Sequence, residues 1–249
     1  MNVTHRSLVL RAATLAALFG GSVVGVAQAA SGTTLNASAP VASGQHVVFD
    51  CSKASVSCRI VAVGEAGSTA QVSATVTGAN ASNVQIVQLP GKPHFIVSLK
   101  GQSNWVGSWL ATWLHPASWF QPQASAVVEL RVPADRPLDI SNTNGSVTVR
   151  GVHAKLHISA VNTPVRTRDS ADLHISTVNG SVHAVVPPGT PNITVSTVNG
   201  SISLLVAHTF DTHVSASTVN GRVRNAFAGA TGAGRVQLST VNGSITIER

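Results

Sequence analysis

The sequence has few charged residues and few aromatic ones. Of its 249 residues, 10% are charged and 4% are aromatic, and there is no tyrosine. A globular protein normally has about a quarter of its residues charged, and coiled coils or long surface helices need charges in quantity. The composition excludes those classes. It also excludes intrinsic disorder, because a hydrophobic content of 43% is enough to bury a core.

Carboxylates and cysteines are also scarce. Nine Asp and Glu residues leave little material for acid–base catalysis or for a metal cage built from oxygen ligands. The two cysteines, Cys51 and Cys58, lie seven positions apart. In an oxidising compartment this predicts one disulfide that closes a short loop. The spacing differs from the C-x-x-C of redox and zinc sites, so we expect no cofactor.

Residues 1–29 have the pattern of a secretory signal peptide. Arg6 and Arg11 precede an apolar run over residues 12–26, and Ala27-Gln28-Ala29 forms a small-x-small cleavage site. The run is shorter than the roughly 20 residues that a membrane span requires. We therefore expect an exported mature chain without a transmembrane span, located in the periplasm, outside the cell or on its surface. Residues 30–45 are predicted to be a flexible segment.

A repeated segment dominates residues 131–249. Its copies recur every 17–22 residues, and each contains an Asn that Gly follows in five copies of six. The exception is Thr163, which precedes Pro164 and predicts an irregular copy. The aligned asparagines are Asn144, Asn162, Asn179, Asn199, Asn220 and Asn242.

Apolar residues stand six and four positions before each Asn and three after it, with polar residues between them. This two-residue period predicts a strand on each side of an Asn-Gly turn. The alternation changes phase just before the Asn, which predicts a bulge near the Ser-Thr pair. Two folds fit: an array of hairpins, or a β-solenoid in which each copy is one coil. Identity between copies favours the solenoid, with Asn side chains hydrogen-bonded along the stack and Gly at a positive-φ corner.

The recurring Ser-Thr-Val-Asn-Gly-Ser, as in residues 176–181, resembles the bacterial "putative adhesin" β-strand-repeat family of unknown function. The related adhesin-head GIN-type domain is similar too. The segment at 127–133, which precedes Leu138-Asp139-Ile140-Ser141, is similar to the segment before the first repeat in such proteins. The likeness covers about residues 46–249. It implies an all-β fold, a β-solenoid or coiled β-sandwich, and an adhesin-like role without assigned catalytic residues.

Residues 46–130 differ from the repeats. Short β-like runs separated by Gly, Asn and Pro predict irregular layers that cap the end of the solenoid. The runs are His46–Phe49, Arg59–Val63, Ala70–Val76, Val84–Val87 and Phe95–Leu99.

All four tryptophans lie in the insertion at residues 101–123. Trp105, Trp109 and Trp113 are spaced by four, which places them on one face of a predicted short helix that ends at Pro116. One interpretation is a buried brace against the solenoid. The other is an exposed contact for an envelope membrane, a glycan or a protein.

One row of side chains offers a candidate metal site, and with it an enzymatic alternative to a binding function. If coils stack in register, Asp139, His157 and His174 form an outward row that could hold a zinc-like ion. The sequence thus favours a non-enzymatic, adhesin-like binding or envelope scaffold module. The alternative is a metal-dependent or glycan-active enzyme that uses this row. The arginines at 166, 168, 222 and 224 are too scattered for a nucleic-acid groove.

Overall fold

The computed structural model describes residues 26–29, 32–52, 56–78, 80–100, 124–170, 172–189, 192–206, 212–227 and 234–248. Within these ranges the fold is all-β, with twenty strands in two sheets and one 3-10 turn, η1 (Ala81–Asn83). No helix in these ranges is long and apolar enough to cross a membrane. The predicted tryptophan helix falls at 101–123, outside the described residues.

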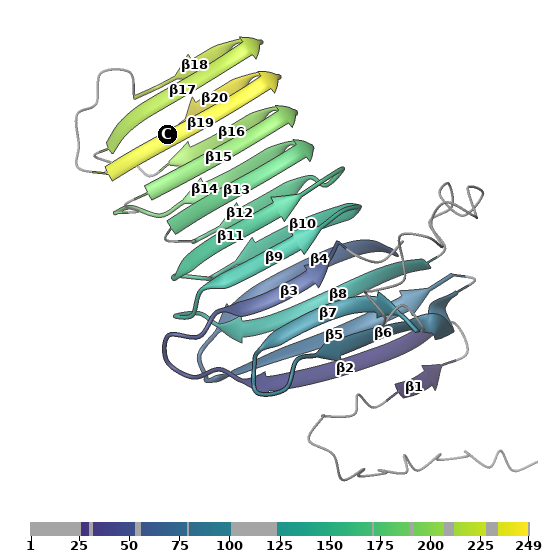
Figure 1. The fold of residues 1–249 in the computed structure, drawn as a ribbon. Coiled ribbons are helices and arrows are strands. Elements are labelled where there is room, and N and C mark those ends of the chain that lie inside the picture. The colour runs from purple at the N-terminus through teal and green to yellow at the C-terminus, as the bar shows by residue number, and fades with distance from the viewer. Residues whose placement is uncertain are drawn as a thin grey trace, which may run out of the picture.

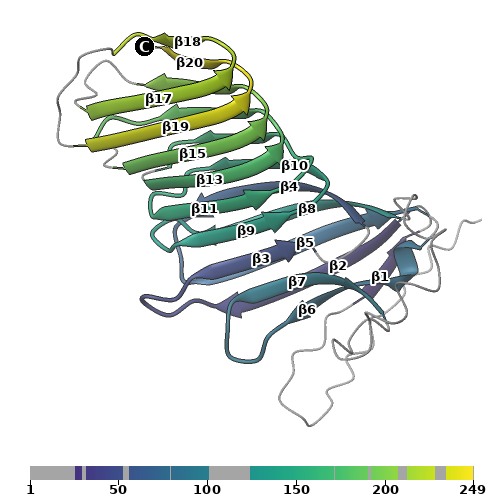
Figure 2. The same cartoon turned by 45° about the horizontal axis from the view of Figure 1, so that its top comes forward.

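The two sheets face each other and enclose the core (Figures 1 and 2). In spatial order the first sheet contains β1 (Val26–Ala29), β2 (Gly32–Pro40), β5 (Thr69–Thr77), β8 (Ala124–Pro133), β4 (Val56–Glu65), β10 (Gly145–Arg150), β12 (Val165–Arg168), β14 (Val182–Val186), β16 (Ile202–Val206), β20 (Ile245–Glu248) and β18 (Val223–Asn225). The second contains β6 (Val84–Gln88), β7 (His94–Leu99), β3 (Val47–Cys51), β9 (Leu138–Asn142), β11 (Lys155–Ala160), β13 (Asp172–Asn179), β15 (Asn192–Asn199), β19 (Gly234–Asn242) and β17 (Thr212–Asn220).

Each repeat is one coil with a strand in each sheet, and neighbouring coils pair in parallel. We number the coils along the chain as 1 (138–150), 2 (155–168), 3 (172–186), 4 (192–206), 5 (212–225) and 6 (234–248). Equivalent residues are register partners, for example Ile158 with Ile140 and with Ile175. A hairpin array would pair the strands of one repeat antiparallel to each other. The parallel ladders exclude the hairpin array and are consistent with a β-solenoid or coiled β-sandwich.

The coils do not stack in chain order. Strand β19 of coil 6 lies between β15 of coil 4 and β17 of coil 5, and β20 lies between β16 and β18 in the other sheet (Figure 1). Coil 5 is therefore the last layer of both sheets in the part of the chain that is described. Its apolar residues are less covered than those of the inner coils: Val223 is 39% exposed, whereas Ile245 beside it is fully buried.

The N-terminal part adds further parallel strands to the same stack and then ends the stack with antiparallel strands. Strands β3 and β4 lie in parallel on coil 1, and β7 and β8 lie in parallel beyond them. Antiparallel strands β6, β5 and β2 then complete this end (Figure 2). The predicted strand runs of this region are confirmed by β3 to β7.

Residues 32–45, the described part of the segment predicted to be flexible, depart from that prediction. Nine of them form β2, which pairs antiparallel with β5 from Thr33 to Pro40. Leu35 and Ala39 are buried against the core, which explains why the segment is ordered although its sequence is rich in small polar residues. Strand β1, which contains the predicted cleavage site, pairs only with β2.

An unbroken asparagine ladder runs along one corner of the stack. Five of the six side-chain amides donate to the side-chain oxygen of the asparagine in the adjacent coil, at 2.7–3.2 Å, and Asn144 at the end of the ladder only accepts. In spatial order the ladder is Asn144, Asn162, Asn179, Asn199, Asn242 and Asn220. The predicted stacking of asparagines is thus confirmed, and it follows the spatial order of the coils.

The repeat glycines serve a different purpose from the one predicted. Only Gly145 of this set has a positive φ, of 125°. A Cβ on Gly180, Gly200, Gly221 or Gly243 would instead collide with a backbone carbonyl of the adjacent coil. Close approach between layers, and not a left-handed corner, requires glycine there. In the copy without glycine, Asn162 itself takes a φ of 49°.

The predicted bulge before the Asn is also wrong. Burial alternates without interruption through β13 and β15, so that the threonine two positions before the Asn points inward and the valine after it points outward. Thr197 is 5% exposed and donates to the carbonyl of Gly180, while Val198 is 41% exposed. Thr240 and Thr218 make the same bond to the glycine carbonyls of their neighbouring coils. A satisfied hydroxyl makes threonine acceptable in the core.

Candidate functional site

The outward side chains of the coils are the part of the repeat that can vary without loss of the fold. The inward rows form the core, and the corner asparagines, threonines and glycines hold the layers together. Outward positions on the two sheets carry two groups of ionisable residues. We call them the histidine row (Asp139, His157 and His174) and the arginine face (Arg150, Arg166, Arg168 and His183).

The histidine row lies on β9, β11 and β13, and the structure confirms its register. His157 is the partner of Asp139 on one side and of His174 on the other. The two imidazole rings stack face to face, with centroids 4.8 Å apart and planes 8° from parallel. At the other end of the row, Asp139 Oδ2 lies 3.0 Å from Nδ1 of His46. The row therefore follows the sheet, one residue per strand.

The environment of the row favours a neutral imidazole at its centre. Burial lowers the pKa of His157, and the neighbouring His174 lowers it further. Asp139 opposes this shift, while Lys155 adds to it. The ring also has a hydrogen-bond partner in the Ser159 hydroxyl, at 3.2 Å from Nε2. Over the described ranges, no three His, Cys, Asp or Glu side chains are grouped so that they could hold a metal ion.

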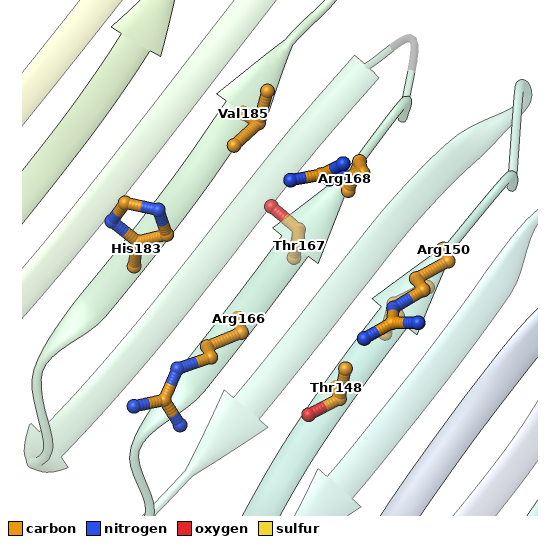
Figure 3. Close-up of a pocket in the computed structure, with 8 residues that line it drawn as sticks. Thr148, Arg150, Arg166, Thr167, Arg168, His183 and Val185 are labelled. Carbon is orange, nitrogen blue, oxygen red and sulfur yellow. The ribbon is translucent and has the colours of Figure 1, made fainter.

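The arginine face lies on the opposite sheet. Arg150 on β10 is the register partner of Arg168 on β12, and Arg166 on β12 is the partner of His183 on β14. Figure 3 shows the four side chains on the same side of these three strands. Thr148 stands beside Arg166, and together with these residues it lines an open hollow of about 250 Å³.

No carboxylate neutralises this group within the described residues. The ion pairs there join other residues, such as Arg131 with Glu65 and Arg136 with Asp135. Arg150, Arg166, Arg168 and His183 are all exposed. Like charges placed directly opposite each other on adjacent strands destabilise a sheet. The arginine face is thus an uncompensated cationic surface that the fold does not need, since coil 4 has Ser203 and Leu205 in the same two rows.

Sequence reasoning misses this group when it considers only arginines in non-adjacent copies and leaves out Arg150 and His183. Arg166 and Arg168 lie far from Arg224, which is on the edge strand β18, and from Arg222, which precedes that strand. The signal that finds the site is the offset from the aligned Asn in neighbouring copies. Arg150 and Arg168 share offset plus six in coils 1 and 2, and Arg166 and His183 share offset plus four in coils 2 and 3.

The third candidate region is the corner edge of the stack. Cys51 at the end of β3 and Cys58 in β4 form the predicted disulfide. Trp105, Trp109 and Trp113 lie outside the described residues, but the strands that flank their segment are placed. Because β7 runs parallel to β3 and β8 parallel to β4, the end of β7 and the start of β8 both lie at the edge that carries this disulfide.

No family model matches the sequence, and no curated protein matches it. Two bacterial structures match over most of the chain. One is a "putative cell adhesion protein" from Clostridium sporogenes, with 10% identity, 86% of this chain and 98% of that chain covered, and a TM-score of 0.48. The other is a "putative adhesin" from Bacteroides fragilis, with 10% identity, 86% and 96% coverage, and a TM-score of 0.30.

Proposed function

We propose that this protein is an exported, non-enzymatic binding or scaffold module of the cell envelope. The observation that supports this most is that, within each coil, the residues that hold the fold together are different from those that face outward. Inward and corner residues build an in-register rod, and the outward rows are free to carry contacts. The first sheet has eleven strands, which at about 4.8 Å per strand extends it over about 48 Å. Such a surface suits an extended partner better than a small enclosed substrate.

Export is supported by the signal-peptide pattern of residues 1–29 and by the disulfide. A Cys51–Cys58 bond persists in oxidising compartments and is rare in the cytosol. Cleavage after Ala29 would remove β1, whose pairing is confined to β2. Strand β2 loses this partner but keeps its pairing with β5, so that the processed chain retains the stack.

Two measurements test the proposal on the exported chain. The intact mass of protein from cell fractions should show loss of residues 1–29 and a mass consistent with one disulfide. The purified protein should then sediment with envelope fragments of the producing cells and stay in the supernatant without them. Recovery of an unprocessed cytosolic chain, or the absence of binding to any envelope fraction, would contradict it.

The enzyme alternative depends on the histidine row. The double substitution His157→Gln with His174→Gln separates the two functions. A binding module keeps its sedimentation with envelope fragments, whereas an enzyme that needs the row loses bound metal and turnover. The stacked His157 and His174 rings favour the first outcome, because ladder neighbours lie face to face and do not converge on one point.

A further inference from the structure

We propose that the arginine face binds acidic polysaccharide through the carboxylate, sulfate or phosphate groups of its sugars. The proposal rests on the binding function proposed above and names the ligand class of one surface. Its starting point is the direct opposition of Arg150 and Arg168 on neighbouring strands, with Arg166 and His183 opposed in the next row.

Placing these cations side by side costs stability unless something neutralises them. Adjacent parallel strands are about 4.8 Å apart, and residues two apart on a strand are about 6.6 Å apart. Four cationic or ionisable groups therefore occupy a small lattice, and none of them has an ion-pair partner in the described part of the chain. An oxyanion between two guanidinium groups would accept charge-assisted hydrogen bonds from both.

The geometry favours a polymer with repeated charges over a single ion. The cations extend in two directions, from Arg150 to Arg168 across strands and from Arg166 to Arg168 along one strand. One small anion reaches only part of this lattice, whereas successive charged sugars reach all of it. The hollow of about 250 Å³ is open, so that a chain can enter at one side and leave at the other.

The chemistry of the lining fits a sugar better than a lipid surface. Thr148 places a hydroxyl among the arginines, and their apolar stems offer surface to the face of a sugar ring. Binding to a bilayer would engage a broad area of the flat sheet. The opposed cations lie in coils 1 to 3, whereas coil 6, which separates them from Arg224 of coil 5, presents Glu248 in the same row as Arg150 and Arg168.

A matched pair of double variants tests the proposal. Arg166→Gln with Arg168→Gln removes two cations from the face. Arg222→Gln with Arg224→Gln makes the same change at the far edge of the sheet, where Arg224 on β18 lies opposite Thr246 and Arg222 directly precedes the strand. Net charge and composition are therefore identical in the two variants.

Binding of the exported chain to polygalacturonate and to dextran sulfate is measured by fluorescence anisotropy, with neutral dextran as the blank. We expect the first variant to bind at least tenfold more weakly and the control variant to stay within twofold of the unaltered chain. The slope of log Kd against log salt should fall in magnitude by about 1 to 2 in the first variant only. Binding to one of the two polymers alone also supports the site and identifies its anion.

Three results would overturn the proposal: equal losses in both variants, no binding to either polymer, or binding only to vesicles of anionic phospholipid. A second measurement needs no variant. Phenylglyoxal labelling of the unaltered chain, read by mass spectrometry, should be suppressed by polygalacturonate or dextran sulfate at Arg150, Arg166 and Arg168 and unchanged at Arg222 and Arg224. Uniform protection of all five arginines would also count against a site.

Failure of this inference can be told from failure of the proposed function. If the unaltered chain and the Arg166→Gln/Arg168→Gln variant sediment equally with envelope fragments, the binding function stands and the arginine face is not its site. If the unaltered chain ignores envelope fragments but binds acidic polysaccharide through the arginine face, the site stands and the envelope role does not.

Discussion

The side chain of Asn242 donates a 2.7 Å hydrogen bond to Asn199, across 43 residues of sequence. Its own oxygen accepts a bond of 2.8 Å from Asn220. Coil 6 is thus inserted between coils 4 and 5, and every asparagine of the ladder still finds a neighbour. The order of the layers differs from the order of the chain, although each layer has the same shape.

The position of coil 6 between coils 4 and 5 predicts that Asn242 contributes more to stability than the equivalent Asn220. Asn242 has a ladder partner on both sides, whereas Asn220 only donates, from the outermost described coil. Asn242→Ala should lower the free energy of unfolding by about 1–2 kcal/mol, and Asn220→Ala by about 1 kcal/mol or less. Urea denaturation of the two variants measures the difference. A larger loss for Asn220→Ala would indicate stacking in chain order instead.

Close packing between layers makes the repeat glycines intolerant of a side chain. A Cβ on Gly200 would collide with the Gly180 carbonyl, so that Gly200→Ala should cost about 3 kcal/mol or prevent folding. Gly91→Ala is the control. It has a positive φ but open space around it, and it should cost only about 1–2 kcal/mol. Thermal unfolding compares the variants, and similar losses would argue against the steric explanation.

The lowered pKa of His157 predicts a pH dependence of stability. The unfolded histidine, with its ordinary pKa of 6.5, takes up a proton at higher pH than the folded one. The folded state should therefore be fully stable above pH 6.5 and lose stability as the pH falls below it, until folded His157 is protonated too. His157→Gln should remove this component. Urea denaturation between about pH 8 and 5 measures it, with His153→Gln as a control outside the row.

The cause of that shift can be tested separately. The imidazole of His174 lowers the pKa of His157, so the substitution His174→Gln should raise that pKa. Asp139→Asn removes the opposing carboxylate and should lower it further. Titration of the His157 ring protons by NMR distinguishes the two variants. Shifts in the same direction would contradict the assigned electrostatics.

The opposed arginines predict a stability gain on substitution. Arg168→Gln relieves the repulsion from Arg150 and should raise the free energy of unfolding by about 0.5 kcal/mol at low salt. The gain should shrink at high salt, because exposed charges are then screened. Arg224→Gln, opposite Thr246, should leave stability unchanged. A destabilised Arg168→Gln at low salt would show that this arginine supports the fold.

The tryptophan insertion remains a predicted contact, and its two interpretations have opposite outcomes. Replacement of Trp109 and Trp113 by Ala should reduce sedimentation with envelope fragments and leave the midpoint of thermal unfolding unchanged. Unchanged sedimentation with a lower midpoint would support a buried brace. Phe120→Ala, in the same insertion but outside the four-residue spacing, provides the matched control.

Much of the fold could be predicted because residues at the same offset in different copies of the repeat become register partners in the sheets. Identical offsets from the aligned asparagines placed Asp139, His157 and His174 in one row, and the row is present. The direction of the Thr-Val pair could not be predicted by hydrophobicity alone. Thr197 is buried because the Gly180 carbonyl satisfies its hydroxyl, and that partner belongs to another coil.

The sequence by itself determined that like residues stack, that the asparagines form a ladder and that one disulfide closes the loop at residues 51–58. Only the tertiary structure decided which coil lies beside which, why the corners need glycine and where the cations meet. The reason is that equivalent copies offer one another nearly the same hydrogen bonds and packing. A chain of such copies specifies how two layers pair, and contacts between distant coils then select which two layers become neighbours.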